Sequence, residues 1–298
     1  MTASRIALVG FGEVGRTLAT DLQRLGIASL TAWDRLFPDP TSTPSLGLTA
    51  DQAVVRASTL GGAVAGADLI IGAVTAGECL NAVREAARSI APGAVWLDLN
   101  SVAPATKITA SKIVADAGGR FVEAAVMSPI APEGLRSPML LSGPFAENVT
   151  PSLHALGFTG ARFCSADYGV ASATKMCRSV IIKGIEALLA ESLLAARHYG
   201  VEGAVLSSLQ DLLPGHDWPT LAKYMISRSL LHGRRRAEEM REAARTVEDA
   251  RVSAWMSRAT VERQSWAGRH QSVHAMPNLG ELLAILRGRS DIHSGMPR

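Results

Sequence analysis

The first half of the chain alternates short apolar runs with longer segments in which apolar residues recur every three or four positions. The short runs predict strands at Ile6–Val9, Ser29–Trp33, Val54–Ala57, Leu69–Val74, Val95–Leu99, Phe121–Val126, Met139–Ser142 and Ala161–Cys164. The longer segments predict helices between most of them, for example Val14–Leu25, Cys79–Ile90 and Pro104–Ala117. Apolar strands that alternate with helices indicate a mostly parallel sheet covered on both faces.

Strand signals end near residue 168, and the remaining chain predicts helices only. One apolar stripe runs from Gly169 to Tyr199, a helix of roughly 45 Å that is long enough to bridge two domains. Further helical segments are Pro219–Leu231, Arg234–Glu248 and Val252–Ala267, with breaks at Pro214-Gly215 and Pro277-Asn278. The pattern therefore predicts a doubly wound α/β domain over residues 1–168 and an all-α domain over residues 169–298.

Composition narrows the class of protein. The chain has 298 residues, of which 47% are hydrophobic and 19% are charged, so two packed cores are expected and disorder is not. The net charge is only +3, and the basic run Arg234–Arg236 is followed at once by Glu238 and Glu239, so a nucleic-acid partner is not expected. Three isolated cysteines without CxxC spacing predict neither a disulfide framework nor a zinc site. Without a signal peptide or a run of ~20 apolar residues, a cytoplasmic protein that does not enter membranes is expected.

A glycine-rich segment, Gly10-Phe11-Gly12-Glu13-Val14-Gly15, follows the first predicted strand and opens the first predicted helix. The spacing G-x-G-x-x-G in this context is typical of loops that bind the pyrophosphate of a dinucleotide at a helix N-terminus. Gly10 permits the tight turn, Gly12 lets the pyrophosphate approach the backbone, and Gly15 lets the helix pack closely on the sheet. The alternative is a plain turn between a strand and a helix.

The choice of dinucleotide depends on the end of the second predicted strand. Asp34 lies there, 19 residues after Gly15, where an acidic side chain binds the ribose hydroxyls and repels a 2′-phosphate. This favours NAD and a dinucleotide-binding Rossmann domain over residues 1–168. NADP is the alternative cofactor, because Arg35 contacts a phosphate if its loop turns the side chain inward.

Two segments of this domain resemble motifs of the β-hydroxyacid dehydrogenases. The segment Asp98-Leu-Asn-Ser-Val-Ala-Pro104 resembles the family's DxSTxxP motif, with Asn100 and Ser101 at the Ser-Thr positions. The segment Glu123-Ala-Ala-Val-Met-Ser-Pro129 lies where the family carries a substrate-binding segment similar to DAPVSGG.

The second half of the chain continues the resemblance. The segment Gly169-Val-Ala-Ser-Ala-Thr-Lys175 resembles the start of the family's catalytic helix, GxGxxxKxxxN, with Ala171 at the second glycine. The segment Arg234–Asp249 resembles the C-terminal helical domain of uncharacterised relatives of 6-phosphogluconate dehydrogenase. The resemblance thus spans nearly the whole chain.

The resemblance implies an NAD(P)-dependent oxidoreductase that interconverts a hydroxyl and a carbonyl group on a β-hydroxyacid-like substrate. Lys175 is implied as the general base in oxidation and the general acid in reduction; the alternative is a solvated helix lysine. Ser179 lies one helical turn later and replaces the family's asparagine, which orients the substrate hydroxyl.

Strand ends supply the other implied contacts. Ser101 is expected to contact the nicotinamide side or the substrate, and Asn100 beside it is expected to contact the substrate, because ligands of open α/β sheets bind at the carboxyl ends of strands. Val74 and Thr75 match the family's backbone contact to the adenine ribose. The alternative for both pairs is ordinary capping of strand ends.

The substrate pocket departs from the family pattern. Met127, Ser128 and Pro129 replace Ser-Gly-Gly, and proline offers no amide hydrogen to a carboxylate. A bulkier or less acidic substrate, for example an aryl-substituted one, is therefore expected.

The helical domain adds candidates for binding an anionic group of the substrate. These are His232, Arg235 and Arg236. The alternative is that the three arginines 234–236 form ion pairs with glutamates three and four positions later on a solvated helix.

Two other functions stay open. An imine reductase shares this architecture, but members that reduce imines commonly lack the lysine, so Lys175 counts against it. A non-catalytic dinucleotide-binding redox sensor has no need of Lys175 at this place. The expected partners are a small-molecule substrate and a second copy of the chain, joined through the helical domain as a homodimer.

Overall fold

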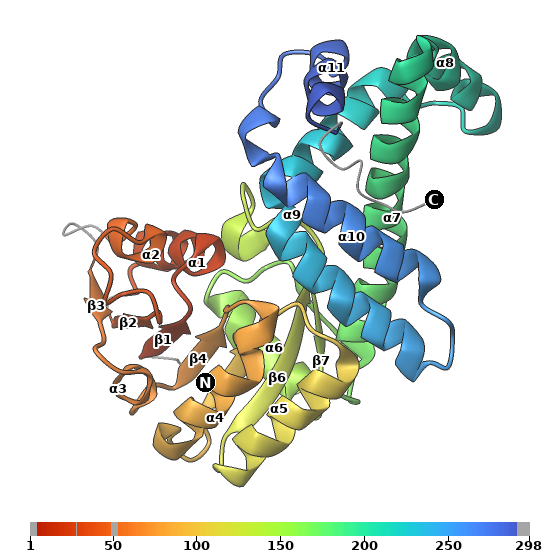
Figure 1. The fold of residues 1–298 in the computed structure, drawn as a ribbon. Coiled ribbons are helices and arrows are strands. Elements are labelled where there is room, and N and C mark those ends of the chain that lie inside the picture. The colour runs from red at the N-terminus through yellow and green to blue at the C-terminus, as the bar shows by residue number, and fades with distance from the viewer. Residues whose placement is uncertain (1–4, 28, 49–52, 291–298) are drawn as a thin grey trace, which may run out of the picture. The chain divides into compact units, whose positions relative to one another are not determined.

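The computed structural model describes residues 5–27, 29–48 and 53–290 (Figure 1). Contacts divide the chain into two compact units, Met1–Met176 and Cys177–Arg298. The division falls inside helix α7 (Val170–Tyr199), whereas the expected boundary after residue 168 lies just before this helix.

One eight-stranded sheet forms the framework of the first unit, with the strand order β3-β2-β1-β4-β5-β6-β7-β8. The strands are β1 (Ile6–Val9), β2 (Leu30–Trp33), β3 (Val54–Arg56), β4 (Leu69–Gly72), β5 (Val95–Asp98), β6 (Arg120–Val126), β7 (Met139–Ser142) and β8 (Ala161–Ser165). Strands β1 to β6 run parallel, β7 is antiparallel to β6, and β8 is parallel to β7. The prediction of eight strands in a mostly parallel sheet is confirmed.

Helices cover both faces of this sheet because neighbouring residues of each strand point to opposite sides. The helices are α1 (Glu13–Arg24), α2 (Thr43–Leu46), α3 (Leu60–Val64), α4 (Cys79–Ala86), α5 (Pro104–Asp116) and α6 (Ala146–Ala155). On one face Leu8 and Ile71 belong to a core with residues of α1 and α6. On the other face Ala7 and Ile70 belong to a core with residues of α3, α4 and α5.

The strand order reverses between β1 and β4, since β2 and β3 lie on one side of β1 and all later strands lie on the other. In open α/β sheets, ligands bind in the crevice outside the carboxyl ends of the strands at such a point. The glycine-rich segment follows β1, and the segment that begins at Asp98 follows β5. The fold therefore brings both motifs to the same edge of the sheet.

The second unit consists of helices and contains the C-terminal part of α7. Its other helices are α8 (Glu202–Leu212), α9 (Trp218–Asp249), α10 (Trp255–Arg269) and α11 (Leu279–Ser290). The expected breaks are confirmed, because Pro214-Gly215 separates α8 from α9 and Pro277-Asn278 precedes α11. The core includes Leu193 of α7, Leu230 of α9 and Leu282 of α11.

Helix α9 corrects the prediction of two separate segments, Pro219–Leu231 and Arg234–Glu248, because it is continuous through the residues between them. Gly233 lies at the junction, and a Cβ atom there would collide with the backbone of Gly268 in α10. The glycine therefore allows α9 and α10 to cross closely and does not end the helix.

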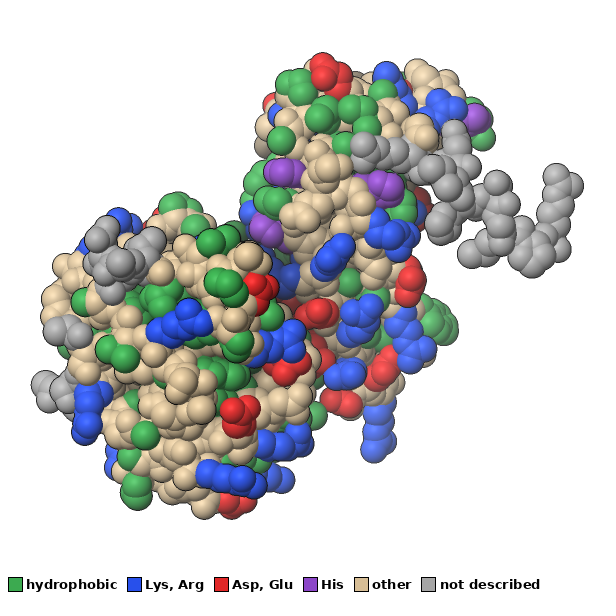
Figure 2. All heavy atoms as spheres, turned by 60° about the vertical axis from the view of Figure 1, so that its left-hand side comes forward, with side chains coloured by type: hydrophobic (Ala, Val, Ile, Leu, Met, Phe, Trp, Pro, Cys, Tyr) green, Lys and Arg blue, Asp and Glu red, His purple; other side chains and the backbone are tan. Residues whose placement is uncertain are grey.

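Charged side chains of both signs lie at the surface of the protein. Figure 2 shows acidic and basic side chains interspersed on the visible face. Among the described residues, no helix combines the length and the apolar character that crossing a membrane requires.

Candidate active site

The three glycines of the loop between β1 and α1 have different surroundings. Gly10 has a φ of +97°, and a Cβ atom there would collide with the carbonyl oxygen of Ala73. A Cβ atom at Gly15 would collide with the carbonyl oxygen of Gly10, so α1 packs tightly on the loop. At Gly12, by contrast, no atom of the described residues other than Gly12 and its two neighbours in the chain lies within 4 Å of where a Cβ would stand.

Gly12 is also the N-cap residue of α1, and as a glycine it has no side chain with which to cap this helix end. Backbone amides at a helix N-terminus attract anions through the partial positive charge of the helix dipole. The open space at Gly12, between two sterically obligatory glycines, fits a dinucleotide pyrophosphate.

Asp34 fixes the glycine loop from the end of β2. Its Oδ2 accepts a hydrogen bond of 2.8 Å from the backbone amide of Phe11, and its Oδ1 accepts one of 2.9 Å from the amide of Leu36. Phe11 itself is fully buried, with its ring 5.8 Å from that of Phe37. Asp34 is partly exposed, and each carboxylate oxygen has further acceptor capacity.

Arg35 does not extend freely from the same strand end. Its guanidinium forms an exposed ion pair of 2.7 Å with Glu78, in the short helix η1 (Ala76–Glu78) that follows β4. Thr75 precedes this helix and is exposed, whereas Val74 is half-buried. Asp34, Arg35 and the end of β4 thus lie along one edge of the sheet.

Lys175 and Ser101 meet, although 74 positions separate them in the chain. The Nζ atom of Lys175 donates a hydrogen bond of 2.6 Å to Oγ of Ser101. Ser101 lies just after β5, Lys175 lies in the second turn of α7, and both side chains are half-buried. Both residues were predicted as site residues from their motifs, but their direct contact was not.

Glu123 anchors the start of α7. This fully buried residue of β6 accepts hydrogen bonds of 2.5 Å from the backbone amides of Gly169 and Ser172. A carboxylate is well placed at a helix N-terminus because of the helix dipole. Glu123 was predicted only as part of a substrate-binding segment, so its contact with α7 was missed.

A second contact fixes the same turn. Gly169 has a φ of +96°, a conformation that favours glycine, and a Cβ atom there would stand 3.1 Å from Cβ of Pro104. Pro104 opens α5 and ends the loop that carries Ser101. The beginning of α7 therefore packs against the end of the loop that carries Ser101, the residue to which Lys175 bonds.

Asn100, which was expected to contact the substrate, is buried. Its side chain accepts a hydrogen bond of 2.7 Å from the amide of Val74 and donates one of 3.0 Å to Asp98. Asp98 in turn forms a buried ion pair of 2.5 Å with Lys107 of α5. Lys107 was not among the residues selected from the sequence, because nothing near it in the chain indicates that its ammonium is buried against Asp98.

In the segment expected to bind the substrate, Pro129 has no amide hydrogen and the amide of Met127 is already bonded. The amide of Met127 donates a hydrogen bond of 2.8 Å to the carbonyl oxygen of Pro138. The hydroxyl of Ser128 donates one of 3.0 Å to the carbonyl oxygen of Pro129. Both Met127 and Ser128 are half-buried.

The remaining candidates belong to the second unit. Ser179 is buried and its Oγ accepts a hydrogen bond of 3.1 Å from Lys183. His232 is half-buried, and Arg235 is exposed, with its Nε 3.9 Å from a carboxylate oxygen of Glu239.

Arg236 corrects the expectation of a solvated ion pair along its own helix. It is buried, and its guanidinium pairs with the buried carboxylate of Glu186 in α7. The reason is that Arg236 lies on a face of α9 that packs inside the unit, where a charge requires a partner.

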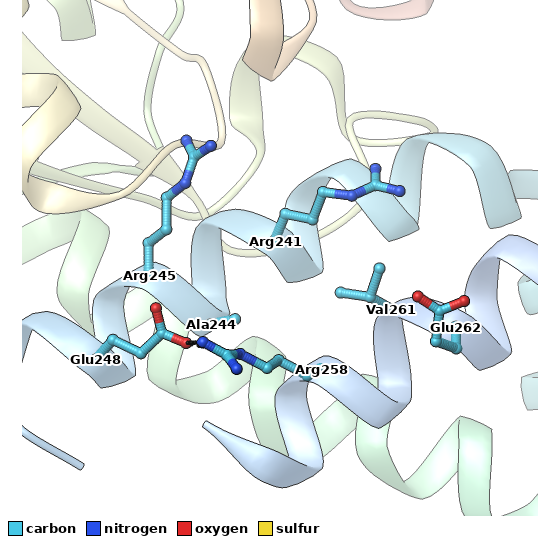
Figure 3. A pocket seen from close by; sticks show the side chains of 7 residues that line it. All are labelled: Arg241, Ala244, Arg245, Glu248, Arg258, Val261 and Glu262. Carbon is cyan, nitrogen blue, oxygen red and sulfur yellow. Dashed lines mark hydrogen bonds and ion pairs between the residues drawn. The ribbon is translucent and has the colours of Figure 1, made fainter. Parts of the chain in front are cut away.

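A pocket of about 330 Å³ also lies in the second unit, between α9 and α10 (Figure 3). Its lining residues are Arg241, Ala244, Arg245, Glu248, Arg258, Val261 and Glu262. Arg258 forms an ion pair of 2.6 Å with Glu248. None of the residues selected from the sequence lines this pocket.

Two family models match the chain. The NAD binding domain of 6-phosphogluconate dehydrogenase matches residues 5–130, and a domain of unknown function (DUF1932) matches residues 196–267. The first match contains the glycine loop, Asp34 and the end of β5.

Several solved structures are similar to the chain over most of its length. A conserved hypothetical protein from Sinorhizobium meliloti 1021 is 36% identical, with 97% of each chain covered and a TM-score of 0.74. A conserved protein described as structurally similar to 3-hydroxyacid dehydrogenases is 29% identical, with 91% of this chain and 100% of that chain covered and a TM-score of 0.68.

More distant structures share the fold. A 3-hydroxyisobutyrate dehydrogenase from Mycobacterium tuberculosis, studied with L-serine, is 16% identical, with coverage of 96% and 100% and a TM-score of 0.70. An imine reductase from Streptomyces aurantiacus is 18% identical, with coverage of 95% and 99% and a TM-score of 0.52.

Proposed function

Because the chain belongs to the β-hydroxyacid dehydrogenase family, we propose that it interconverts a hydroxyl and a carbonyl group on a β-hydroxyacid-like substrate, with Lys175 as the general acid and base. The observation that carries this proposal is the 2.6 Å hydrogen bond from Lys175 to Ser101. It joins a proton-transfer group to the carboxyl end of β5, on the edge of the sheet that also carries the glycine loop.

The cofactor of this family of folds is a nicotinamide dinucleotide, which when bound accepts or supplies the hydride. The open backbone at Gly12 binds the pyrophosphate, and Val74 and Thr75 contact the adenosine side from the end of β4. Asp34, already held beside Phe11, accepts hydrogen bonds from the ribose hydroxyls. We assign NAD as the preferred cofactor because the Asp34 carboxylate repels a 2′-phosphate and Arg35 is engaged by Glu78.

Lys175 and Ser101 divide the handling of the proton. During oxidation the neutral amine of Lys175 accepts the proton of the substrate hydroxyl, and during reduction the ammonium returns a proton to the carbonyl oxygen. Ser101 accepts a hydrogen bond from Lys175, so its own hydroxyl hydrogen is available to the substrate oxygen. The pair therefore orients the oxygen at which the proton moves.

The substrate is expected to be larger than a small hydroxyacid. The amide of Met127 is already bonded to Pro138, and Pro129 has no amide hydrogen, so a carboxylate finds fewer backbone donors here. The methionine side chain offers an adaptable apolar surface to an aryl or other bulky substituent. Substrate contacts by Ser128, Ser179, His232 and Arg235 stay predictions of the sequence.

A homodimer joined through the helical domain is part of the same proposal. Ile181 and Leu188 of α7 lie two turns apart on one side of the helix and are 65% and 57% exposed. Large apolar side chains that are exposed together are typical of association surfaces. Analytical ultracentrifugation of the wild type and of Ile181→Glu tests this; a monomeric wild type contradicts it.

Absorbance at 340 nm tests the proposed reaction. The wild-type protein is assayed with NAD and NADP against small β-hydroxyacids, aryl-substituted β-hydroxyacids, and amines as substrates for imine formation. Turnover of a β-hydroxyacid, lost in Lys175→Ala, is the expected result. Turnover of amines alone favours an imine reductase, and tight NAD binding with no turnover of any compound favours a redox sensor.

A further inference from the structure

A cluster of buried polar residues lies next to Ser101 and has no role in the proton transfer itself. Its members are Asp98, Asn100 and Lys107, whose exposed fractions are 0%, 4% and 1%. A buried charge is costly unless it is paired and hydrogen-bonded. The two charged residues, Asp98 and Lys107, therefore require each other as partners, and the buried carboxamide of Asn100 requires hydrogen bonds of its own.

Lys107 holds the carboxylate of Asp98 from helix α5. Its Nζ atom donates hydrogen bonds of 2.5 Å to Oδ1 and 2.9 Å to the backbone carbonyl oxygen of Asp98. The indole nitrogen of Trp96 donates a bond of 3.2 Å to Oδ2. The side chain and the backbone of Asp98 are thus both fixed at the point where β5 ends.

Asn100 links the end of β5 to the end of β4 by hydrogen bonds. Its backbone amide and its Nδ2 donate hydrogen bonds of 3.1 and 3.0 Å to the two carboxylate oxygens of Asp98. Its Oδ1 accepts the 2.7 Å bond from the amide of Val74. Because Val74 only donates and the carboxylate only accepts, a single orientation of the carboxamide satisfies both.

The carboxamide of Asn100 is therefore committed to protein groups. Besides its bond to Asp98, Nδ2 lies 3.4 Å from the sulfur of Cys79. Burial, and then the nearby Asp98 charge, raise the pKa of Cys79, so this sulfur stays a neutral thiol. These contacts leave Asn100 no donor for a substrate.

From this geometry we infer that Asn100 and Lys107 are positioning residues, which hold the end of β4 and Ser101 at a fixed separation. The inference rests on the proposed function, in which the end of β4 contacts the cofactor and Ser101 contacts Lys175. Val74 is bonded to Asn100, and Ser101 is the next residue in the chain. The buried cluster thereby determines the position of the cofactor relative to Lys175, the general acid and base.

Two variants each remove a different hydrogen-bonding group from this buried cluster. Asn100→Ala removes the link to Val74, and Lys107→Met removes the ammonium that holds Asp98. Lys112→Met is the matched control, because Lys112 lies on the same helix α5 and is exposed. Each protein is compared with the wild type in thermal unfolding, in hydrogen exchange of the Val74 amide and in the dissociation constant for NADH.

In Asn100→Ala the Val74 amide is expected to exchange at least tenfold faster, and the dissociation constant for NADH to rise about tenfold. Once a substrate is identified, kcat is expected to fall about 100-fold, because misplacement of reacting groups by roughly 1 Å costs about this factor. Lys112→Met is expected to match the wild type in every measurement. Lys107→Met repeats the losses of Asn100→Ala, and if it does not fold, Asn100→Ala alone decides.

The two proposals fail in different ways. If the wild type does not bind NADH or NADPH, the proposed function is wrong. Hydrogen exchange of the Val74 amide still tests the role of the buried cluster in that case. If the wild type binds NADH and a folded Asn100→Ala binds it equally well with unchanged exchange at Val74, the positioning role is overturned. A lower melting temperature with unchanged NADH affinity and unchanged kcat also overturns it, because that pattern belongs to a merely structural residue.

Discussion

Glu123 and Ser172 are joined by a hydrogen bond of 2.5 Å between the buried carboxylate and the backbone amide, three residues before Lys175. The other carboxylate oxygen accepts the amide of Gly169. A side chain in the middle of the sheet thus determines where the helix that carries Lys175 begins.

Replacement of Glu123 by glutamine is expected to lower the free energy of unfolding by ~1–3 kcal/mol. Glutamine has nearly the same shape, but its NH2 group cannot accept a hydrogen bond, so one of the two amides loses its partner. Urea denaturation measures this. Glu147→Gln is the control, since Glu147 lies exposed in the first turn of α6; equal losses in both variants would contradict the role of Glu123.

The three glycines of the nucleotide loop are expected to respond differently to alanine. Gly12→Ala meets open space, so its free energy of unfolding should change by no more than ~1 kcal/mol, while NADH affinity falls at least tenfold because the methyl group occupies the place of the pyrophosphate. Gly15→Ala should destabilise the fold by ~1–3 kcal/mol or more, since its methyl collides with the Gly10 backbone. Calorimetric titration and denaturant unfolding separate the two effects. Normal NADH affinity in Gly12→Ala would place the pyrophosphate elsewhere.

The fold was largely predictable because its strongest signals are local. A strand of a parallel sheet is buried on both faces, so runs such as Ile6–Val9 and Leu69–Gly72 are apolar throughout. The glycine motif is local too, and the approach of Asp34 follows once β2 is placed beside β1 in the sheet.

The missed features depend on contacts between distant segments. No pattern near Glu123 indicates that its carboxylate bonds to residue 172, and no pattern near Lys107 indicates that its ammonium is buried against Asp98. Asn100 was expected to bind the substrate because its motif position suggests it, yet its carboxamide is used within the protein. The segments Pro219–Leu231 and Arg234–Glu248 were predicted separately, whereas Gly233 between them lets α10 pack closely on one continuous helix.

Cofactor preference is expected to depend on Asp34 and on the ion pair of its neighbour. Asp34→Ser removes the charge that repels a 2′-phosphate, and Glu78→Gln releases Arg35 from its 2.7 Å ion pair at little cost in stability. The ratio of dissociation constants for NADP and NAD should shift toward NADP about tenfold in the single variant Asp34→Ser, and further in the double variant. Fluorescence titration with both dinucleotides measures the ratio. An unchanged ratio in the double variant would mean that neither residue reaches the ribose.

Tyr168 is expected to make stability fall at high pH. Burial, and then the charge of Glu123, raise the pKa of Tyr168 to about 12 from its ordinary value of 10.0. The folded protein keeps the phenol proton between these pH values while the unfolded chain loses it, so this contribution is fully present below pH 10 and is lost as the pH rises through 12.

Tyr168→Phe tests this effect, because it leaves no phenol to titrate. Its stability should depend less steeply on pH between 10 and 12 than that of the wild type. At neutral pH the variant should be ~1 kcal/mol less stable, since the 3.0 Å hydrogen bond to the carbonyl oxygen of Phe121 is lost. Tyr199→Phe, at a residue that is 75% exposed, is the control. Parallel pH profiles for Tyr168→Phe and the wild type would contradict the assignment.

The contact between Lys175 and Ser101 predicts that proton transfer and cofactor binding are separable. Lys175→Ala removes the acid and base, so kcat should fall by ~10²-fold or more while the NADH dissociation constant changes less than twofold. Ser101→Ala keeps the amine and removes only the hydroxyl that accepts its 2.6 Å bond, so a smaller loss of ~10-fold is expected. Stopped-flow measurement of hydride transfer isolates the chemical step from product release. If Lys175→Ala transfers hydride at the wild-type rate, another group must move the proton, because this variant has lost the amine and gained nothing that could replace it.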